Sequence, residues 1–538
     1  MNDLLSTQKK LFLKGTLVLS LAALITKILS AVYRVPFQNM VGDTGFYIYQ
    51  QVYPFYGLAI ALATYGFPVI ISKLIAEQTK KNETHFANRI LIPSLLAIFL
   101  FCLSIFTIFY FGAGYIAQFL GDSNLAPLVK MCSFLFLLVP VISIFRGYFQ
   151  GIGDMQPTAI SQVLEQSMRV FLILFLAFWL TSEGYSLYKI GQSAIVASVL
   201  GFITTVLFLT ALYLKRNKKK QRVRWNFPPM VETLSTMKVV FLQGLAICLS
   251  GLTLVLFQLA DTFQIFPTLI SQGYLEEDAK IIKGIYDRGQ PLIQIGLVLA
   301  TSFSLSIVPT LSSVDLKKSK EIKEYVRLSF LLTSVIGSGA AIGLVLIMEP
   351  LNRMLFMNGS GTFVLQILVL SVLFASLNAT LLSVLQALGK MKLTSMIVIS
   401  GVVAKILFNS LLVSKYGTKG AALSTNLALI LMLIILIIQI RKLFGKNILK
   451  DMKFPQMIYA LGWMMLSVVL FIRLTEIFNI ETQRAFASFQ AIVGAIIGGS
   501  IFLFVLIKRE FFTKKEFEVI PFGEKLLKMQ HKKWRKRL

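Results

Sequence analysis

The chain has 538 residues, of which 56% are apolar and only 14% charged, and its mean hydropathy is +0.75. Soluble globular proteins carry about a quarter charged residues, so water is excluded as the main solvent of this chain. The net charge of +28 would also fit nucleic-acid binding, but its clusters lie between apolar segments, which favours a membrane surface and no nucleic acid.

Little in the composition supports covalent chemistry. The three cysteines lie in apolar runs without paired spacing, and there are only two histidines, so a disulfide scaffold or a metal centre is not expected. The chain also has no Gly-rich phosphate loop followed by Lys-Ser or Lys-Thr, the motif that holds ATP. We therefore expect a secondary-type transporter and no enzyme, without a cofactor.

Taken in chain order, a polar start, Met1–Lys10, precedes a long apolar run that we assign to a first span and not to a removed signal peptide. A spanning helix needs about 20 apolar residues, and this criterion predicts fourteen spans. They are 13–33, 44–72, 88–111, 126–149, 157–181, 190–214, 236–259, 288–311, 326–348, 363–386, 393–413, 419–440, 456–474 and 486–507.

The Lys and Arg residues predict the orientation of these spans. Four basic clusters fall on one side, at 215–224, 317–327, 441–453 and 508–537. Because positive loops stay inside, we expect a multi-pass protein of the bacterial cell membrane with both termini cytoplasmic. The basic end, 532–537, is either a solvated topology signal or a contact with anionic membrane lipids.

An internal repeat is visible at an offset of 236 residues. Gln150, Gly153, Met155, Thr158 and Arg169 are matched by Gln386, Gly389, Met391, Thr394 and Lys405. Six helices would thus duplicate six, and an even number keeps the copies parallel. We expect an all-α polytopic fold with an N-terminal lobe (1–225), a C-terminal lobe (226–445), a central cavity, two additional helices (446–510) and a basic cytoplasmic tail (511–538).

Charged residues inside spans are costly and mark function. Lys27 and Arg34 lie about two turns apart on nearly one face of span one. Both are candidates for lining the cavity, and for Arg34 the alternative is snorkelling at the outer end of the span.

Four further charged residues are candidates for the substrate-binding cavity. Glu165 and Arg169 on span five have the i, i+4 spacing of an ion pair, so a purely structural pair is their alternative. Asp261 closes span seven and Arg288 opens span eight, which places both near the external mouth, where an ordinary loop salt bridge is the alternative.

Span two contains four residues that break or bend helices, and we propose them as gating or hinge positions: Pro54, Gly57, Gly66 and Pro68. Prolines free carbonyls and bend helices. Passive kinks are the alternative, since membrane helices also tolerate them.

Several segments resemble one known family. They are 146–151 (RGYFQG), 155–159 (MQPTA), Ser161-Gln162, Glu165-Gln166, 288–292 (RGQPL) and 27–36. These segments resemble the polysaccharide biosynthesis and stage V sporulation protein B family, in the MurJ-like lipid II flippase branch of the MATE-like exporter superfamily.

The resemblance implies a flippase that moves an undecaprenyl-pyrophosphate-linked sugar precursor, first of all lipid II for peptidoglycan, to the outer leaflet by alternating access. It also implies a cationic cavity, a groove for the lipid tail beside the last two spans, and coupling to membrane potential or monovalent ions. The cavity arginines of the branch correspond most nearly to Lys27 and Arg288. Gram-negative members carry further arginines in span two, whereas residues 54–62 here have none.

Three alternatives remain open. The cargo could be another lipid-linked oligosaccharide, such as a teichoic, capsular or exopolysaccharide unit, and the cellular role could lie in growth and cell shape or in sporulation. A cation-coupled drug exporter would need carboxylates in its cavity. A membrane scaffold would instead recruit cell-wall synthesis enzymes as partners through its basic loops.

Overall fold

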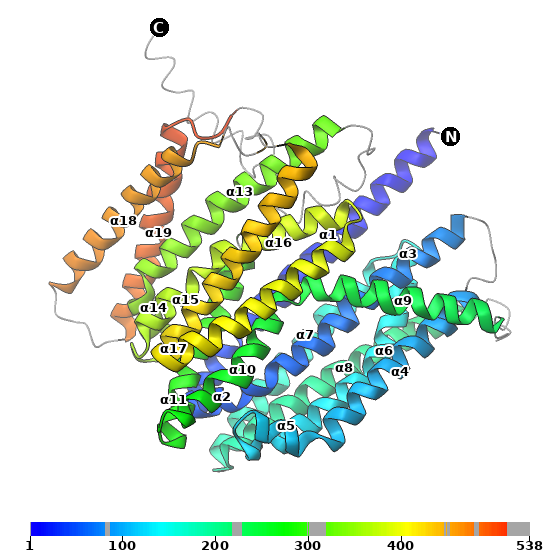
Figure 1. The fold of residues 1–538 in the computed structure, drawn as a ribbon, viewed down its shortest axis with the longest axis horizontal. Coiled ribbons are helices and arrows are strands. Elements are labelled where there is room, and N and C mark those ends of the chain that lie inside the picture. The colour runs from blue at the N-terminus through cyan, green and yellow to red at the C-terminus, as the bar shows by residue number, and fades with distance from the viewer. Residues whose placement is uncertain are drawn as a thin grey trace, which may run out of the picture. The chain divides into compact units, whose positions relative to one another are not determined.

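The computed structural model describes residues 2–80, 87–217, 229–298, 300, 319–445, 448, 452–477 and 484–513. Helices make up nearly all of them, and strands do not occur in these ranges (Figure 1). Twelve helical segments of the described chain are long and apolar enough to cross a membrane. The predicted all-α polytopic fold is confirmed.

The chain forms two compact units, which do not coincide with the predicted lobes. The first contains 1–295 and 385–432, and the second contains 296–384 and 433–538. The lobe boundaries at 225 and 445 therefore stay a prediction.

Unit 1 is a bundle of long helices with three short irregular helical turns. Its helices are α1 (Asn2–Val32), α2 (Arg34–Ala61), η1 (Leu62–Gly66), α3 (Phe67–Lys80), η2 (Ala87–Leu91), α4 (Ile92–Phe111), α5 (Ala113–Phe119), η3 (Ser123–Leu125), α6 (Ala126–Gly151), α7 (Gln156–Ser182), α8 (Leu187–Asn217), α9 (Met230–Gly251), α10 (Thr253–Ser271), α11 (Glu276–Asp287) and most of α17 (Met391–Phe444).

Unit 2 contains the predicted last two spans. Its helices are α13 (Ser319–Leu346), α14 (Met348–Phe356), α15 (Thr362–Val369), most of α16 (Ser371–Ala387), the end of α17, α18 (Phe454–Glu476) and α19 (Arg484–Lys508). Spans thirteen and fourteen are α18 and α19. The basic tail lies outside the described residues beyond residue 513.

Two glycines turn the chain between consecutive spans. Gly42 inside α2 has φ +69° and Gly417 inside α17 has φ +56°, a left-handed region that glycine enters without a Cβ clash. Each turn folds the chain back into antiparallel arms. In α17 the arms pack so closely that a Cβ on Gly420 would lie 2.0 Å from the carbonyl oxygen of Leu412. The predicted gaps after residues 33 and 413 contain or adjoin these turns.

Span seven departs from its predicted bounds. Instead of one helix at 236–259, the chain breaks at Leu252 between α9 and α10. Asp261 consequently lies in the middle of α10 and does not close a span. Of span eight, helix is described at 289–298 and most of the remainder lies outside the described residues.

Large apolar side chains cover the outside of the helices. Phe111, Phe178 and Ile496 are 75%, 65% and 61% exposed, respectively, on helices that are apolar enough to span a bilayer. Water would not accept such surfaces, so we assign these faces to lipid. The polar side chains are turned inward, where they form the candidate site.

Candidate functional site

Arg169 of α7 lies in a cluster of tyrosines inside unit 1. One guanidinium nitrogen donates hydrogen bonds of 2.7 Å to the hydroxyls of both Tyr33 and Tyr49, and the guanidinium carbon lies 3.9 Å from the centre of the Tyr56 ring. Ser198 and Gln166 accept the remaining bonds at 3.1 and 3.2 Å. All these partners are neutral, so the positive charge of Arg169 is solvated but not cancelled.

Arg34 stands beside this cluster with fewer partners. Its side chain is 0% exposed, and its guanidinium carbon lies 4.2 Å from the centre of the Tyr53 ring. Within the described residues, none of its three guanidinium nitrogens has a hydrogen-bond partner. The neighbouring groups that act on its charge are again phenols, those of Tyr53, Tyr33 and Tyr49. Complete burial rules out snorkelling at the end of the span. We call Arg34, Arg169, Tyr33, Tyr49, Tyr53 and Tyr56 the tyrosine box.

Lys27 continues the cationic face of α1 toward the N-terminus. It is half-buried, and within the described residues no ion pair or hydrogen bond reaches its ammonium. Lys27 and Arg34 lie seven residues apart, and the backbone at Tyr33 between them keeps helical angles, so they share a face. Lys27 therefore extends the cationic face of α1 beyond the tyrosine box, and neither cation pairs with a carboxylate among the described residues.

Glu165 does not pair with Arg169, so the predicted i, i+4 ion pair is wrong. Its carboxylate instead lies 2.9 Å from the guanidinium of Arg146 on α6. Arg146 also donates to the carbonyl of Ala63 at 3.2 Å and to the hydroxyl of Thr64 at 2.9 Å. Both acceptors belong to η1, a π-helical turn, whose altered ladder leaves a carbonyl for Arg146. The Arg146–Glu165 pair therefore carries no net charge and stabilises the irregular turn η1.

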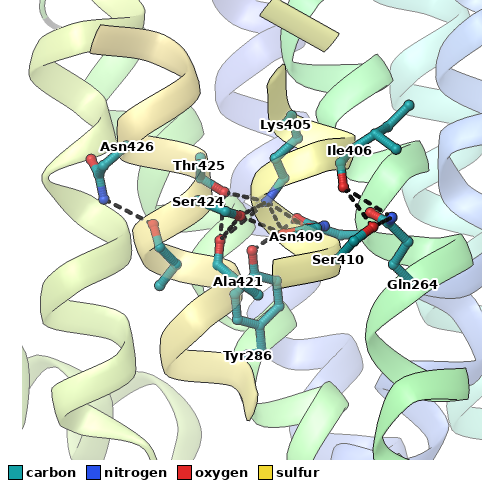
Figure 2. A network of polar contacts seen from close by, with 12 residues as sticks. Gln264, Tyr286, Lys405, Ile406, Asn409, Ser410, Ala421, Ser424, Thr425 and Asn426 are labelled. Atoms are coloured by element: carbon teal, nitrogen blue, oxygen red, sulfur yellow. Dashed lines mark hydrogen bonds and ion pairs between the residues drawn. The ribbon is translucent and has the colours of Figure 1, made fainter. Parts of the chain in front are cut away.

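Asp261 is held by residues of α17 and α11. Figure 2 shows these partners, Lys405 and Asn409 of α17 and Tyr286 of α11. One carboxylate oxygen lies 2.7 Å from the Lys405 ammonium and accepts from the Asn409 amide at 2.8 Å. The other accepts from the Tyr286 hydroxyl at 2.8 Å. Lys405 also contacts Ser424 and Thr425 at 2.9 and 2.8 Å. Asp261 is thus a fully satisfied buried carboxylate and not part of a loop salt bridge with Arg288.

Arg288 forms a bidentate pair with Asp43, at 2.8 Å from its Nε and 2.5 Å from one terminal nitrogen. Asp43 follows the turn at Gly42, and α11 packs so closely on this turn that a Cβ on Gly284 would lie 2.2 Å from the carbonyl oxygen of Asp43. The predicted cavity arginine is therefore paired with an internal carboxylate, and a substrate anion would have to displace Asp43 to bind it.

Another buried ion pair lies in α11, which is not one of the membrane-crossing helices. Lys283 lies 2.6 Å from Asp287 and both are buried. Burial raises the pKa of the Asp287 carboxyl to about 6, although Lys283 opposes the shift. A polar cavity of about 10 Å³, enough for about one water molecule, is lined by Gln50, Gln258, Asp261, Thr262, Lys283, Asp287 and Gln290.

The four predicted hinge residues surround the irregular part of span two. Pro54 lies inside α2, Gly66 ends the π-helical turn η1, and Pro68 is the second residue of α3. Gly66 allows close contact, since a Cβ there would lie 1.8 Å from the Cys248 sulfur, and Gly57 packs on Val255. The break in the helix is therefore present, and its gating role stays a prediction.

Residues missed as site residues by the sequence analysis include the four tyrosines, Lys405 and Asp43. Tyr49, Tyr53 and Tyr56 recur at i, i+4 and i+7, the spacing of one helical face, and this was the available signal. Lys405 was visible only as the repeat counterpart of Arg169. No local pattern pairs Asp43 with Arg288, which is 245 residues away.

Comparisons with known proteins agree on one family. The profile described as "Polysaccharide biosynthesis protein" matches residues 12–315. The uncharacterized membrane protein YabM of Bacillus subtilis (strain 168) is 41% identical over 99% of both chains. Lipid II flippase MurJ of the same organism is 28% identical over 91% of this chain and 94% of its own.

A solved structure shares the fold. Lipid II flippase MurJ in an inward closed conformation has a TM-score of 0.62, with 16% identity over 91% of this chain and 100% of that one. At this identity the likeness concerns the fold alone. Together with the profile and the relatives, it confirms the resemblance predicted from the 146–151 and 155–159 segments.

Proposed function

The chain belongs to the polysaccharide biosynthesis protein family, and on this premise we propose that it flips an anionic lipid-linked glycan precursor across the bacterial cell membrane. Lipid II, the cargo named for one relative, is the first candidate. The movement runs from the cytoplasmic to the outer leaflet by alternating access, with both termini cytoplasmic, and involves no covalent step.

The observation that carries this proposal is Arg34, which is fully buried and has no ion pair or hydrogen bond in the part of the chain that the structure describes. An isolated buried charge costs several kcal/mol unless it is paired, and the phenols around Arg34 do not neutralise it. A pyrophosphate crossing the membrane has the opposite need, because its charges lose water. Arginine binds phosphate oxygens in a bidentate manner. The pyrophosphate would first meet Lys27 and then bind Arg34.

The sign of the charge supports coupling to the membrane potential. The energy of moving one charge is about 2.3 kcal/mol per 100 mV, and an interior-negative potential drives an anion outward. Transport of a pyrophosphate toward the outer leaflet is thus favoured without ATP.

The buried carboxylates argue against a cation-coupled drug exporter. Glu165, Asp261 and Asp287 are each ion-paired with a basic side chain, which leaves these acids no free charge for a drug cation. Another lipid-linked oligosaccharide is a better second candidate, since it would present the same pyrophosphate to Arg34.

The test is flipping of lipid II by the purified protein in vesicles, with and without an imposed potential. We compare the wild type with Arg34→Gln, Arg34→Lys and the control Arg473→Gln, whose side chain is 75% exposed. Arg34→Gln should slow flipping by about tenfold or more, equivalent to about 1.4 kcal/mol, Arg34→Lys should retain part of the rate, and the control should match the wild type.

Each other result has a defined meaning. If the protein flips a different pyrophosphate-linked glycan but not lipid II, the proposed cargo is wrong and the proposed site stands. If Arg34→Gln flips at the wild-type rate, Arg34 does not belong to the substrate-binding site. Vesicles indistinguishable from empty ones for every pyrophosphate-linked glycan would overturn the flippase proposal and favour the scaffold, which tolerates loss of Arg34.

A further inference from the structure

Asp287 lies at the end of α11, between two residues that attach this helix to its neighbours. Within unit 1, α11 packs on α2 and α10 (Figure 1). Tyr286 donates to Asp261 of α10 at 2.8 Å, and Arg288 binds Asp43 of α2 at 2.8 Å. Asp287 is held in the interior between these two attachments, and only 3% of it is exposed.

The Asp287 carboxylate has few hydrogen-bond donors for a buried charge. Both of its oxygens contact one group, the Lys283 ammonium, at 2.6 and 2.7 Å, and within the described residues no other donor reaches them. The nearby Asp261 carboxylate instead contacts three donor groups on two helices. A buried carboxylate needs donors to replace its water, so Asp287 is the less well stabilised anion of the two.

Gln50 of α2 has the complementary defect, an acceptor without a donor. It is 5% exposed, and its side-chain carbonyl oxygen is buried with no hydrogen-bond partner among the described residues. Gln50 and Asp287 line the same polar cavity of about 10 Å³, which has room for about one water molecule. A protonated carboxyl group carries one O–H donor, so a proton on Asp287 supplies the donor that the Gln50 oxygen lacks.

We propose that Asp287 is a proton-binding site that controls the affinity of the tyrosine box for its anion. On acidification Asp287 takes up one proton from the solvent and donates it in a hydrogen bond to the Gln50 oxygen, directly or through one water molecule in the cavity. Lys283 then keeps its positive charge without a counter-charge. This inference rests on the proposed anion site at Arg34 and adds a control by pH to it.

The charges around Asp287 are otherwise balanced by ion pairs. The charged and titratable groups that act on Asp287 from α11, α10 and α2 are Lys283, Tyr286, Asp261, Arg34 and Tyr47. Lys405 cancels the charge of Asp261. Asp43 likewise cancels the charge of Arg288. Protonation of Asp287 therefore adds one unit of positive charge to this region.

The added charge acts on Arg34, which lies close enough to Asp287 for each charge to affect the other. A more positive surrounding attracts an anion more strongly, and a bound anion in turn favours protonation of Asp287 by the same factor. Burial raises the pKa of the Asp287 carboxyl to about 6, so this group titrates in mildly acidic solution. Acidification therefore strengthens anion binding, and neutral pH weakens it.

The experiment measures binding of a short-chain dialkyl pyrophosphate to the full-length protein in detergent, by calorimetry between about pH 5 and about pH 8. Both charges of this diester stay constant over the range, because each phosphate has already lost its strongly acidic proton. The wild type should bind the probe about fivefold more tightly at the acid end, the lower end of typical coupling between two sites. It should also take up protons on binding.

Three variants and a control separate charge from structure. Asp287→Asn copies the protonated form and should bind with the acid-end affinity at every pH. Asp287→Asn with Lys283→Met also removes the released cation and should bind at every pH like the wild type at the alkaline end. Gln50→Asn withdraws the acceptor oxygen and should move the midpoint to lower pH. Glu277→Gln, on a side chain of α11 that is 71% exposed, should keep the wild-type pH dependence.

A wild-type affinity that does not change with pH, or the same change in Asp287→Asn, would overturn the proposal. If Asp287→Asn does not fold, the double variant decides, because a pH dependence like that of the wild type would overturn the proposal and a constant affinity would support it.

Thermal unfolding gives a second readout that does not depend on the anion. Because the pKa of Asp287 is raised in the folded protein, the folded state binds this proton more tightly than the unfolded chain. Acidification from about pH 7 to about pH 5 should therefore stabilise the wild type relative to Asp287→Asn. This difference without any binding of the probe would support the proton site and overturn both the control of affinity and the anion site. Loss of the difference as well would overturn the whole inference.

Discussion

The tyrosine box and the surroundings of Lys405 hold buried cations in opposite ways. Five oxygen atoms, from Asp261, Asn409, Ala421, Ser424 and Thr425, contact the Lys405 ammonium and are called the lysine cage. The box and the cage each hold a fully buried cation at corresponding positions of the repeat, Arg169 and Lys405. The box surrounds its cation with phenols and keeps the positive charge, whereas the cage cancels its charge with Asp261. An environment that stays positive can attract an anion, whereas a neutral environment has no net charge with which to bind one. The comparison therefore supports our proposal that the box binds the substrate, whereas the cage holds its helices together.

The largest expected effect is on the cage. Asp261→Asn leaves the Lys405 ammonium buried without its counter-charge, and breaking a buried pair in this way costs about 3–5 kcal/mol. Unfolding of the purified protein in denaturant checks this value. Adding Lys405→Met should restore most of the loss, because the pair is then replaced by neutral groups. A single variant as stable as the wild type would mean that the cage does not depend on charge.

The second effect is on the box, where the corresponding deletion should cost less. Arg169→Gln removes hydrogen bonds that involve a charge, worth about 1.5–3 kcal/mol, but leaves no unpaired charge behind, and the Tyr33 and Tyr49 hydroxyls still contact each other at 2.6 Å. The same denaturant experiment, run beside Asp261→Asn, checks the order. If Arg169→Gln were the more damaging change, the assignment of the two regions would be reversed.

Sequence alone could predict most of the described spans, the family and several of the buried cations, but not the partners of these cations. Apolar runs mark crossings because lipid imposes length and composition, and Gly42 and Gly417 supply the turns. The break at Leu252 was missed because both α9 and α10 are apolar, so composition does not change there. Partners such as Asp43 are set by helix packing over hundreds of residues, which no local spacing encodes.

Glu165 illustrates the same limit from the opposite side. Its i, i+4 neighbour Arg169 was the natural partner by sequence, yet Arg146 on the adjacent α6 forms the pair. The Arg146 side chain also donates hydrogen bonds to the π-helical turn η1. These contacts together stabilise the protein by more than the few tenths of a kcal/mol that an ion pair along one helix contributes. Local pairing rules therefore fail where two helices are in close contact.

The ion pair of Asp43 and Arg288 is less buried than the pair of Asp261 and Lys405. Asp43 keeps 15% of its side chain exposed while holding Arg288, which is buried. Asp43→Asn should therefore cost about 2 kcal/mol, within the range for hydrogen bonds to charged groups, and less than Asp261→Asn because water reaches the vacated side. Unfolding at low and high salt checks this, with Glu476→Gln at an exposed pair as the control. Loss equal to that of Asp261→Asn would show that this pair is shielded like the cage.

The smallest effect should come from one phenol of the box. Tyr49→Phe removes a hydroxyl that accepts from Arg169 at 2.7 Å but keeps the ring, and Tyr33 remains as an acceptor of the same nitrogen. We expect a cost of about 1 kcal/mol in unfolding free energy, the net value of a typical hydrogen bond. The electrostatic attraction for an anion should be unchanged, since no charge is altered. Unfolding and lipid II binding by the same variant measure the two quantities.

Tyr115→Phe, on a side chain that is 73% exposed, is the matched control and should change neither. Strongly weakened binding in Tyr49→Phe, without loss of stability, would mean that the phenols bind the anion themselves, and the positive charge of the box would then be only part of the site.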